Sequence, residues 1–580
     1  MSLTGLIGLY VRQNWRPYLL SALMLASVSA LTVFIPRQVG HIVDGMVAGT
    51  LQPDALPAQL AKLVLAGVAI YFLRVAWRLQ LFAASYRLGA QLRQRLYARL
   101  CQQGPQFFQQ KRTGDLMALA TNDIDSVEMA SGEAMLAGFD GTLTLIMVVA
   151  MMSLGVDIRL AGAALLPFPL MALAFWRISN HIHQASRESL NAFGALNDHV
   201  QETLTGVRTL RALGLEARSA VRLSELAEAA ASASLRAQRW EAAFEPAVGI
   251  TLVSATALTL GLGGYLVWAG ELTVGALTAF SMYLGQLIWP MFAAGWVLAL
   301  LERGRAAWGR LQPTLDAPLS IDDHGRLDAV LPGALVFEGV NFTYPGQQAH
   351  ALSGLRLHLP AGQTLGLVGA TGSGKSSVLR LILRQYAAQS GNIAWGGKLL
   401  SDYRLQALNR AISWVPQEPF LFSATIADNI ALAKPDASRA EIEEAARLAS
   451  IHDDIVRMPH GYDTPVGEKG IALSGGQRQR VAIARALLTD AQLLLLDDAL
   501  SAVDTQTETD ILQHLRSARV GRTALIVSHR LSAVMDADHI LVLKGGHVSE
   551  QGNHASLLEH NGWYAAQWRY QQLEASLDAA

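Results

Sequence analysis

Two segments in the second half of the chain carry residues suited to phosphate and metal chemistry. The first, residues 369–376, reads Gly-Ala-Thr-Gly-Ser-Gly-Lys-Ser and follows a strand-like stretch at 365–368. In this spacing the glycines let backbone N–H groups turn toward an anion, Lys375 neutralises phosphate charge, and the Ser376 hydroxyl can bind Mg²⁺. A coincidental glycine turn is the alternative. The residues predicted to hold the phosphates are Gly369, Thr371, Gly372, Ser373, Gly374, Lys375, Ser376 and Ser377.

The second segment supplies paired carboxylates. Four leucines at 493–496 precede Asp497 and Asp498. This favours a buried strand that delivers both acids to a site, over two acids in a surface turn. A carboxylate in that position suits Mg²⁺ beside nucleotide phosphates, and we assign that role to Asp497.

The elements around these segments predict an α/β domain. Strand-like stretches at 365–368, 492–496 and 524–527 alternate with helical stretches at 376–386 and 505–516. Such alternation is typical of a largely parallel sheet with crossover helices. We expect a proline-containing linker at 313–333, followed by a nucleotide-binding domain at 334–580 that ends in a C-terminal helix.

Composition indicates a membrane domain before the linker. Of the 580 residues 16% are charged and 51% hydrophobic, and the mean hydropathy is +0.26, which excludes a disordered or ordinary soluble chain. The 46 basic and 47 acidic residues nearly cancel, so no nucleic-acid partner is expected. The single cysteine, Cys101, cannot form an intramolecular disulfide and excludes a cysteine cluster for zinc or iron–sulfur chemistry.

Six apolar runs before residue 302 approach or exceed the length of a membrane-spanning helix. They lie at 17–36, about 63–84, 141–156, 160–176, 246–270 and 272–301. One run alone could be a buried soluble helix, and the first could be a signal peptide, but the series favours a six-span domain at 1–312. Arginine-rich connections at about 83–132 and 177–240 are predicted to be helical and cytoplasmic, which places both ends of the chain inside.

Further residues make the motif set specific. Residues 473–477, Leu-Ser-Gly-Gly-Gln, resemble the signature of ATP-binding cassette proteins, and Gln417, the stretch 501–504 and His529 match other motifs of that family. The whole chain resembles an exporter-type half-transporter of this superfamily. The resemblance implies six α-helical membrane spans followed by an α/β nucleotide-binding cassette, with ATP and Mg²⁺ as ligands. It also implies a multi-pass protein of the bacterial inner membrane with the N-terminus and the cassette in the cytoplasm.

The resemblance implies roles for single residues. Tyr344 would stack on adenine, Gln417 would contact Mg²⁺ or the attacking water, and His529 would hold the γ-phosphate. In isolation they read as a strand aromatic, a surface glutamine and a structural histidine. The signature residues are expected to face the γ-phosphate held by a second subunit: Ser474, Gly475, Gly476 and Gln477. The alternative is that they only cap a helix.

Three further regions resemble parts that relay motion in the family. Glu468, within 464–470, resembles the cross-linking loop, with a solvated turn as the alternative. The segments around 113–116 and 206–214 look like the two coupling regions that receive motion from the cassettes.

One position departs from the family. These proteins usually carry Glu after the Mg²⁺ aspartate, as the catalytic group that positions the attacking water, whereas this chain has Asp498. One methylene fewer withdraws the carboxylate by about 1.3–1.5 Å, and a misplacement near 1 Å can cost on the order of a hundredfold in rate. The stretch 497–504 resembles heterodimeric bacterial multidrug exporters with one weakened ATP site, and 563–564 and 570–574 resemble their multidrug-resistance-like A subunits. We therefore expect a second half-transporter that carries Glu.

The expected function is ATP-driven export of small amphipathic compounds or drugs, with the lipid bilayer as surroundings. A lipid or peptide exporter is an alternative, and an ATP-gated channel or regulator is an alternative from another class. Four residues are candidates for lining a broad apolar cavity: Tyr283, Trp289, Met291 and Trp296. The alternative is that they form a helix-packing or lipid-facing stripe. Three charged residues lie near these apolar runs: Arg74, Arg78 and Asp140. They would line a hydrated path or pair with each other, and snorkelling of the arginines from helix ends is the alternative.

Overall fold

The computed structural model describes residues 1–580 except 468–469, 471, 502, 504, 519–521 and 579–580. The chain divides into two compact units. The first contains Met1–Arg99 and Gly114–Ala317, and the second contains Leu100–Thr113 and Pro318–Ala580. The tip of the first long connection thus belongs to the second unit, where the Gly104 N–H donates to Ser320 Oγ at 2.8 Å.

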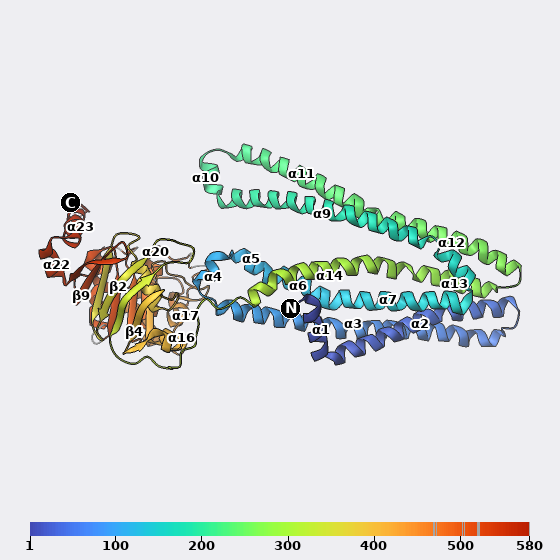
Figure 1. Ribbon diagram of the computed structural model, residues 1–580, viewed down its shortest axis with the longest axis horizontal. Helices are drawn as coiled ribbons and strands as arrows, with labels where there is room; N and C mark the ends of the chain where they lie inside the picture. The colour runs from blue at the N-terminus through green and yellow to red at the C-terminus, as the bar shows by residue number, and fades with distance from the viewer. Residues whose placement is uncertain (468–469, 471, 502, 504, 519–521, 579–580) are drawn as a thin grey trace. The chain divides into compact units, whose positions relative to one another are not determined.

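The first unit consists of long helices (Figure 1). Its helices are α1 (Leu3–Gln13), α2 (Trp15–Val47), α3 (Leu56–Cys101), α5 (Thr113–Ala118), α6 (Ile124–Met129), α7 (Met135–Ala150), α8 (Ile158–Leu165), α9 (Phe168–Thr205), α10 (Val207–Ala212), α11 (Glu216–Ala242), α12 (Phe244–Trp268), α13 (Val274–Gln286) and α14 (Ile288–Leu315). Within the described residues, six helical segments are long and apolar enough to cross a membrane. They confirm the six predicted spans.

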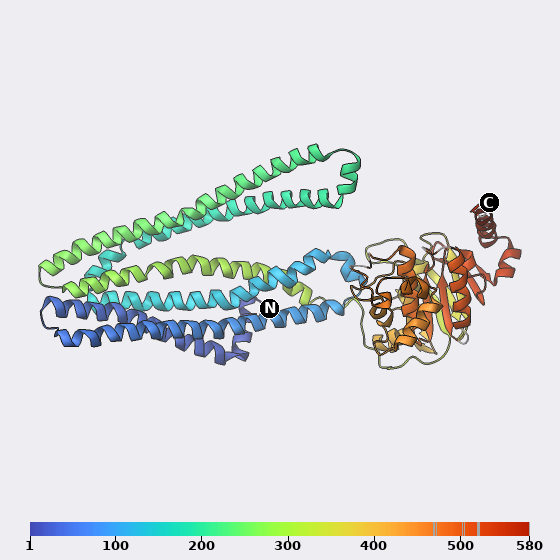
Figure 2. The ribbon, with the colours of Figure 1, turned by 180° about the vertical axis from the view of Figure 1, so that it is seen from behind.

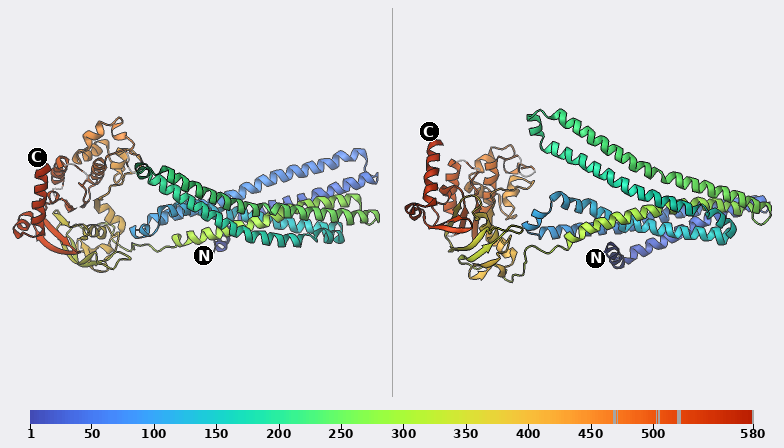
Figure 3. Two further views of the ribbon diagram at one scale, coloured as in Figure 1. Left: turned by 90° about the horizontal axis from the view of Figure 1, so that it is seen from above. Right: turned by 45° about the horizontal axis from the view of Figure 1, so that its top comes forward.

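The arginine-rich connections are continuations of these helices. α9 and α11 pack against each other over much of their length, and the further views in Figure 3 show the same pairing. Seen from behind, α14 lies beside α7 (Figure 2). A tight turn at 157–159 joins the third and fourth spans, and the Asp157 carboxylate caps α8 there by accepting the Arg159 and Leu160 N–H groups at 2.8 and 3.1 Å.

Close packing of glycines joins α2 to α13. A Cβ on Gly275 would lie 2.0 Å from the Gly40 carbonyl oxygen, so the two helices approach as closely as bare backbones allow. The Asp44 carboxylate then accepts the Gly275 N–H and the Thr273 hydroxyl, both at 2.7 Å. These bonds fix where α13 begins.

The second unit is built on two sheets. Its main sheet has the order β10-β9-β3-β8-β7-β6 and is parallel except at β10. The strands are β3 (Thr364–Gly369), β6 (Ile412–Val415), β7 (Leu493–Asp497), β8 (Thr523–Val527), β9 (His539–Lys544) and β10 (His547–Gly552). The predicted largely parallel α/β domain is therefore present, and every residue of β7 and β8 is buried.

The sequence interpretation missed the second sheet. It is antiparallel, with the order β2-β1-β4-β5. Its strands are β1 (Leu335–Phe342), β2 (Leu352–Leu359), β4 (Ser390–Trp395) and β5 (Lys398–Leu399). The side chains of β1 and β2 join those of the main sheet in one apolar core.

Helices complete the second unit. They are α4 (Pro105–Gln110), α15 (Lys375–Ile382), α16 (Leu405–Ala411), α17 (Ile426–Ala431), α18 (Arg439–Leu448), α19 (His452–Val456), α20 (Gly475–Leu487), α21 (Thr505–Ala518), α22 (His554–His560) and α23 (Trp563–Asp578). The helix expected at 376–386 ends at Ile382, because Arg384 adopts a left-handed backbone with φ 49°.

Candidate active site

The phosphate loop joins β3 to α15 and depends on glycine at two tight positions. Gly369 and Gly374 have φ of 148° and 103°. A Cβ would lie 2.2 Å from the Leu543 carbonyl oxygen at the first and 2.4 Å from the Ala351 carbonyl oxygen at the second. Another residue would therefore strain the loop and displace the backbone N–H groups that begin α15.

Polar groups inside the loop are ready for an anion. Ser373 is 3% exposed, and its buried hydroxyl has no hydrogen-bond partner among the described residues. Lys375 donates to the carbonyl oxygens of Gly369 and Ala370 at 2.8 and 3.0 Å. Burial lowers the pKa of this ammonium, and the nearby Asp498 and Asp497 oppose that shift. Because buried polar groups need partners, phosphate oxygens fit this loop.

The remaining phosphate-loop candidates lie on the same turn and helix. Thr371 is exposed, Ser377 is buried, and Ser376 is half-buried in the first turn of α15. The Ser376 hydroxyl donates to Asp497 Oδ1 at 3.1 Å. The structure thus brings the loop and the acidic strand together, as the sequence predicted.

Asp497 ends β7 and Asp498 follows it, and the two residues have different surroundings. Asp497 is 8% exposed, and burial is the main cause that raises the pKa of its carboxyl group. Asp498 has φ 48°, and its carboxylate accepts the His529 N–H at 3.3 Å and the Ser528 hydroxyl at 3.5 Å. Asp498 therefore contacts the segment that carries His529.

Tyr344 follows β1, and its phenol is already bonded. The hydroxyl lies 3.0 Å from Ser377 Oγ and accepts from Arg380 at 3.0 Å. Its ring packs edge-on against Phe342 and Tyr386, with centroids 4.8 and 5.3 Å away. These contacts tie the aromatic side chain to the helix that follows the phosphate loop.

The signature residues form a capped helix end. Ser474 Oγ accepts the Gln477 N–H at 3.2 Å, while Gln477 Oε1 accepts the Ser474 N–H at 3.0 Å. Gly475 begins the 13-residue α20 and is exposed with Ser474, whereas Gly476 is half-buried. Ser474 and Gln477 therefore do cap α20, and the exposed N-terminus of this helix can still face an anion.

Other predicted residues lie apart from this cluster. Gln417 is exposed two residues after β6 ends, and no hydrogen bond within the described part of the chain joins it to the phosphate loop. The predictions for Glu468 and, within 501–504, for Ala502 and Asp504 fall outside the described residues. The segment 113–116 forms the start of α5, and 206–214 contains α10.

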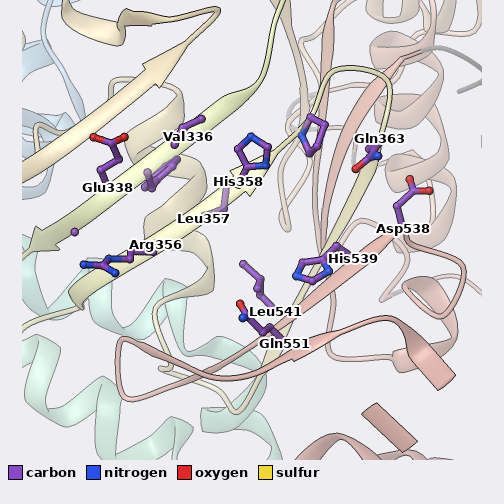
Figure 4. A pocket seen from close by; sticks show the side chains of 13 residues that line it. Val336, Glu338, Arg356, Leu357, His358, Gln363, Asp538, His539, Leu541 and Gln551 are labelled. Atoms are coloured by element: carbon purple, nitrogen blue, oxygen red, sulfur yellow. The ribbon is translucent and has the colours of Figure 1, made fainter. Parts of the chain in front are cut away.

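A hollow of about 980 Å³ in the second unit lies elsewhere (Figure 4). It is lined by strands β1, β2, β9 and β10, including Glu338, Arg356, His358 and His539. Its lining contains none of the nucleotide motifs. The nucleotide motifs therefore lie outside this hollow.

The membrane candidates divide into buried and exposed sets. Tyr283 is buried and donates to the Val33 carbonyl oxygen at 2.9 Å, so it is part of the packing. Trp289 and Trp296 are exposed, while Met291 packs at the edge of a core cluster. Trp289 Nε1 donates to Asp140 Oδ2 at 3.2 Å.

The two arginines make different contacts. Arg78 lies over the Trp77 ring, 5.7 Å from its centroid. Arg74 is exposed. The sequence left pairing with an arginine as one of three alternatives for Asp140, and the hydrogen-bonding partner that the structure shows is Trp289.

Comparison with known proteins places both units in one family. Residues 18–291 match the ABC transporter transmembrane region, and residues 352–501 match the ABC transporter domain. The fold matches a bacterial Atm1-family ABC exporter with ATP bound, at a TM-score of 0.83 and 30% identity, over 96% of this chain and 99% of that one. The chain belongs to the ABC exporter half-transporters.

Curated relatives of this ABC exporter share its full length. The multidrug resistance-like ATP-binding protein MdlA of Escherichia coli is 43% identical over 100% of this chain and 98% of its own length. The probable multidrug resistance protein YheI of Bacillus subtilis is 38% identical over 98% and 97% of the two chains. An ATP-dependent lipid A-core flippase of Chromohalobacter salexigens is 32% identical over 98% and 97%. ATP hydrolysis coupled to transport across a membrane is therefore the activity of this exporter.

The sequence interpretation missed several site contacts. Ser528 binds the Asp498 carboxylate and Arg380 binds Tyr344. Ser528 could have been suspected from its place between the last residue of β8 and His529. The bond from Arg380 had no sequence signal, because it depends on how α15 faces the turn after β1.

Proposed function

We propose that this exporter moves small amphipathic compounds or drugs outward across the bacterial inner membrane as one half of a heterodimer. In this proposal each ATP lies between the phosphate loop of one chain and the signature of the other. The site at this chain's own phosphate loop hydrolyses slowly, and the partner's site, completed by Ser474–Gln477 of this chain, hydrolyses fast. The MdlA and YheI relatives, both named for multidrug resistance, support the substrate class.

The observation that carries the asymmetry is the environment of Asp498. Its side chain is short, the residue is 9% exposed, and the carboxylate is bonded to the Ser528–His529 segment. A general base has to reach the proton it removes from the attacking water, and a misplacement near 1 Å costs on the order of a hundredfold in rate. A carboxylate held against this segment is poorly placed for that step.

The other site residues retain their expected roles. The loop from Gly369 to Ser377 holds the phosphates, with Lys375 as counter-charge. Tyr344 supports the adenine, and His529 holds the γ-phosphate. Gln417 reports nucleotide state once a nucleotide and a second cassette are bound.

Mg²⁺ fits the pair formed by Ser376 and Asp497. A hydroxyl and a buried carboxylate 3.1 Å apart are hard oxygen donors. Burial disfavours the ionised carboxylate, so a nearby cation would relieve that cost. When bound, Mg²⁺ would neutralise charge on the β- and γ-phosphates.

We place the N-terminus and the cassette in the cytoplasm. The Arg-rich α9–α11 connection and the first long connection would then lie inside, in agreement with the preference of basic segments for that side. Functionally we assign residues 1–312 to transport, 313–333 to the linker and 334–580 to nucleotide binding. The segments at 113–116 and 206–214, with Glu468, would transmit motion between the domains.

Co-purification followed by reconstitution tests the proposal. The tagged chain, expressed from its native source, should recover a second half-transporter with Glu at the position of Asp498. The pair in proteoliposomes should accumulate amphipathic dyes against a gradient when ATP is outside. A homodimer that transports at full rate contradicts the heterodimer, and ATP-dependent leakage without accumulation indicates the channel alternative.

A lipid exporter is the second candidate, supported by the flippase relative. The same proteoliposomes distinguish it. Labelled lipid that changes leaflet with ATP, without accumulation of soluble dyes, favours lipid transport over drug export.

A further inference from the structure

The segment that carries His529 is held from the C-terminal helix. We call residues 528–531 the histidine loop; it links β8 to the short turn at Leu531–Ala533. Gln571 of α23 donates from Nε2 to the His529 carbonyl oxygen at 2.8 Å. Its Oε1 accepts the Leu531 N–H, also at 2.8 Å. One side-chain amide thus bonds the backbone on both sides of Arg530, as a neighbouring strand would.

Acidic residues also hold the histidine loop. The Asp498 carboxylate accepts the His529 N–H at 3.3 Å. Glu508, 3% exposed, forms an ion pair with Arg530 and accepts the Ser532 hydroxyl at 3.0 Å. The His529 backbone therefore donates its N–H to Asp498 and accepts at its carbonyl oxygen from Gln571. The His529 side chain remains exposed.

α23 is itself well anchored. Glu550 of β10 accepts the Trp563 and Tyr564 N–H groups at 2.6 and 3.2 Å. Tyr564 is 0% exposed, and its hydroxyl bonds His554 Nδ1 at 2.7 Å. Gln571 follows Tyr564 by seven residues, or about two turns, so both lie on the face of α23 that packs against the cassette.

We infer that Gln571 is a positioning residue, which sets the placement of the His529 side chain toward the γ-phosphate. This inference rests on the role proposed for His529. A side-chain amide that bonds both flanking peptide groups restricts rotation of the loop without touching the nucleotide. Its loss should weaken binding of ATP, which has a γ-phosphate, and spare ADP, which lacks one.

The test measures ATP and ADP affinity of the full chain, produced without another transporter subunit and placed in lipid nanodiscs. EDTA is present so that no ATP is hydrolysed. The variants are Gln571→Leu, which removes both bonds, and Gln571→Glu, which keeps the acceptor for Leu531 but loses the donor to His529. Gln572→Leu on the exposed face of α23 is the matched control, and His529→Ala is the reference for a lost γ-phosphate contact.

Gln571→Leu and Gln571→Glu should lower the preference for ATP over ADP by about three- to tenfold, with ADP affinity within about twofold of the parent. Gln572→Leu should match the parent. Faster amide exchange in peptides spanning 528–534 of Gln571→Leu, but not of Gln572→Leu, should accompany this loss.

Two outcomes overturn the inference alone. The first is an unchanged preference for ATP over ADP in both Gln571 variants, although His529→Ala has lost that preference. The second is an equal loss of ATP and ADP affinity in the Gln571 variants, which would mean that α23 merely supports the fold. An unchanged preference in His529→Ala itself overturns the proposed role of His529, and with it the inference. The reference variant therefore separates the two failures.

Discussion

Lengthening the side chain at Asp498 tests the weakened-site proposal most directly. Asp498→Glu adds one methylene and moves the carboxylate by about 1.5 Å, away from the His529 N–H that it now accepts at 3.3 Å. Because misplacement near 1 Å costs on the order of a hundredfold, the longer acid should raise turnover at this site by roughly 10- to 100-fold. The left-handed backbone at this position, φ 48°, suits Asp better than Glu, so a stability loss of about 1 kcal/mol should accompany the gain.

The measurement requires that this site be observed alone. Ser474→Arg places bulk and charge at the capped N-terminus of α20, which in the proposed dimer completes the partner's fast site. The residual ATPase activity of the purified pair then belongs to this chain's phosphate loop. In that background Asp498→Glu should raise the residual rate, and Asp498→Asn should lower it.

The single variants provide the complementary comparison. Ser474→Arg alone should abolish most ATPase and vesicle transport, whereas Asp498→Asn alone should leave a substantial fraction. Dimer recovery and nucleotide binding, measured separately, serve as controls. If Asp498→Glu brings no gain, or if Asp498→Asn is the more damaging single change in an intact dimer, Asp498 is a working catalytic acid and the reasoning fails.

Three further perturbations have definite expected results. Lys375→Ala should weaken ATP binding at this chain's own loop by about tenfold or more, and unchanged affinity there, with the partner site blocked, would contradict the assignment. Burial raises the pKa of Asp497 above its usual 3.8. The folded protein therefore loses stability as pH rises through this raised pKa, because the buried carboxyl group then has to ionise. Asp497→Asn should thus melt about 2–4 °C higher than the parent without nucleotide at pH 7–8, but not below about pH 4, and Mg²⁺-dependent nucleotide affinity should fall; a lower melting temperature at pH 7–8 refutes the burial argument. Gly275→Ala, whose Cβ would lie 2.0 Å from the Gly40 oxygen, should cost about 1–3 kcal/mol in detergent unfolding, while Gly285→Ala, with no atom within 4 Å, should be neutral; equal effects would show that the close contact is not what limits stability.

The features that could be predicted from the sequence were those formed by residues close together along the chain. The spacing of Gly369–Ser376 after an apolar strand predicted the phosphate loop, and the leucines before Asp497 predicted β7. Six long apolar runs predicted six spans, because a helix must satisfy its own backbone in a bilayer. Sequence could not predict the antiparallel β2-β1-β4-β5 sheet, because its central pairing of β1 with β4 joins distant segments, such as those of Leu335 and Trp395.

Contacts between distant segments were decided by the tertiary structure. The one-methylene difference at Asp498 is visible in the sequence, but its carboxylate meets the His529 N–H only because β7 and β8 are neighbours in the parallel sheet. Likewise Gln571 is an ordinary polar residue of a C-terminal helix until Glu550 and Tyr564 fix that helix beside the histidine loop. Residue types and spacing determined which chemistry this chain can perform, since phosphate binding needs a particular local backbone. The packing of strands and helices determined which groups hold His529 and Asp498 in place, because hydrogen bonds between residues 31 to 42 positions apart depend on where the folded elements lie.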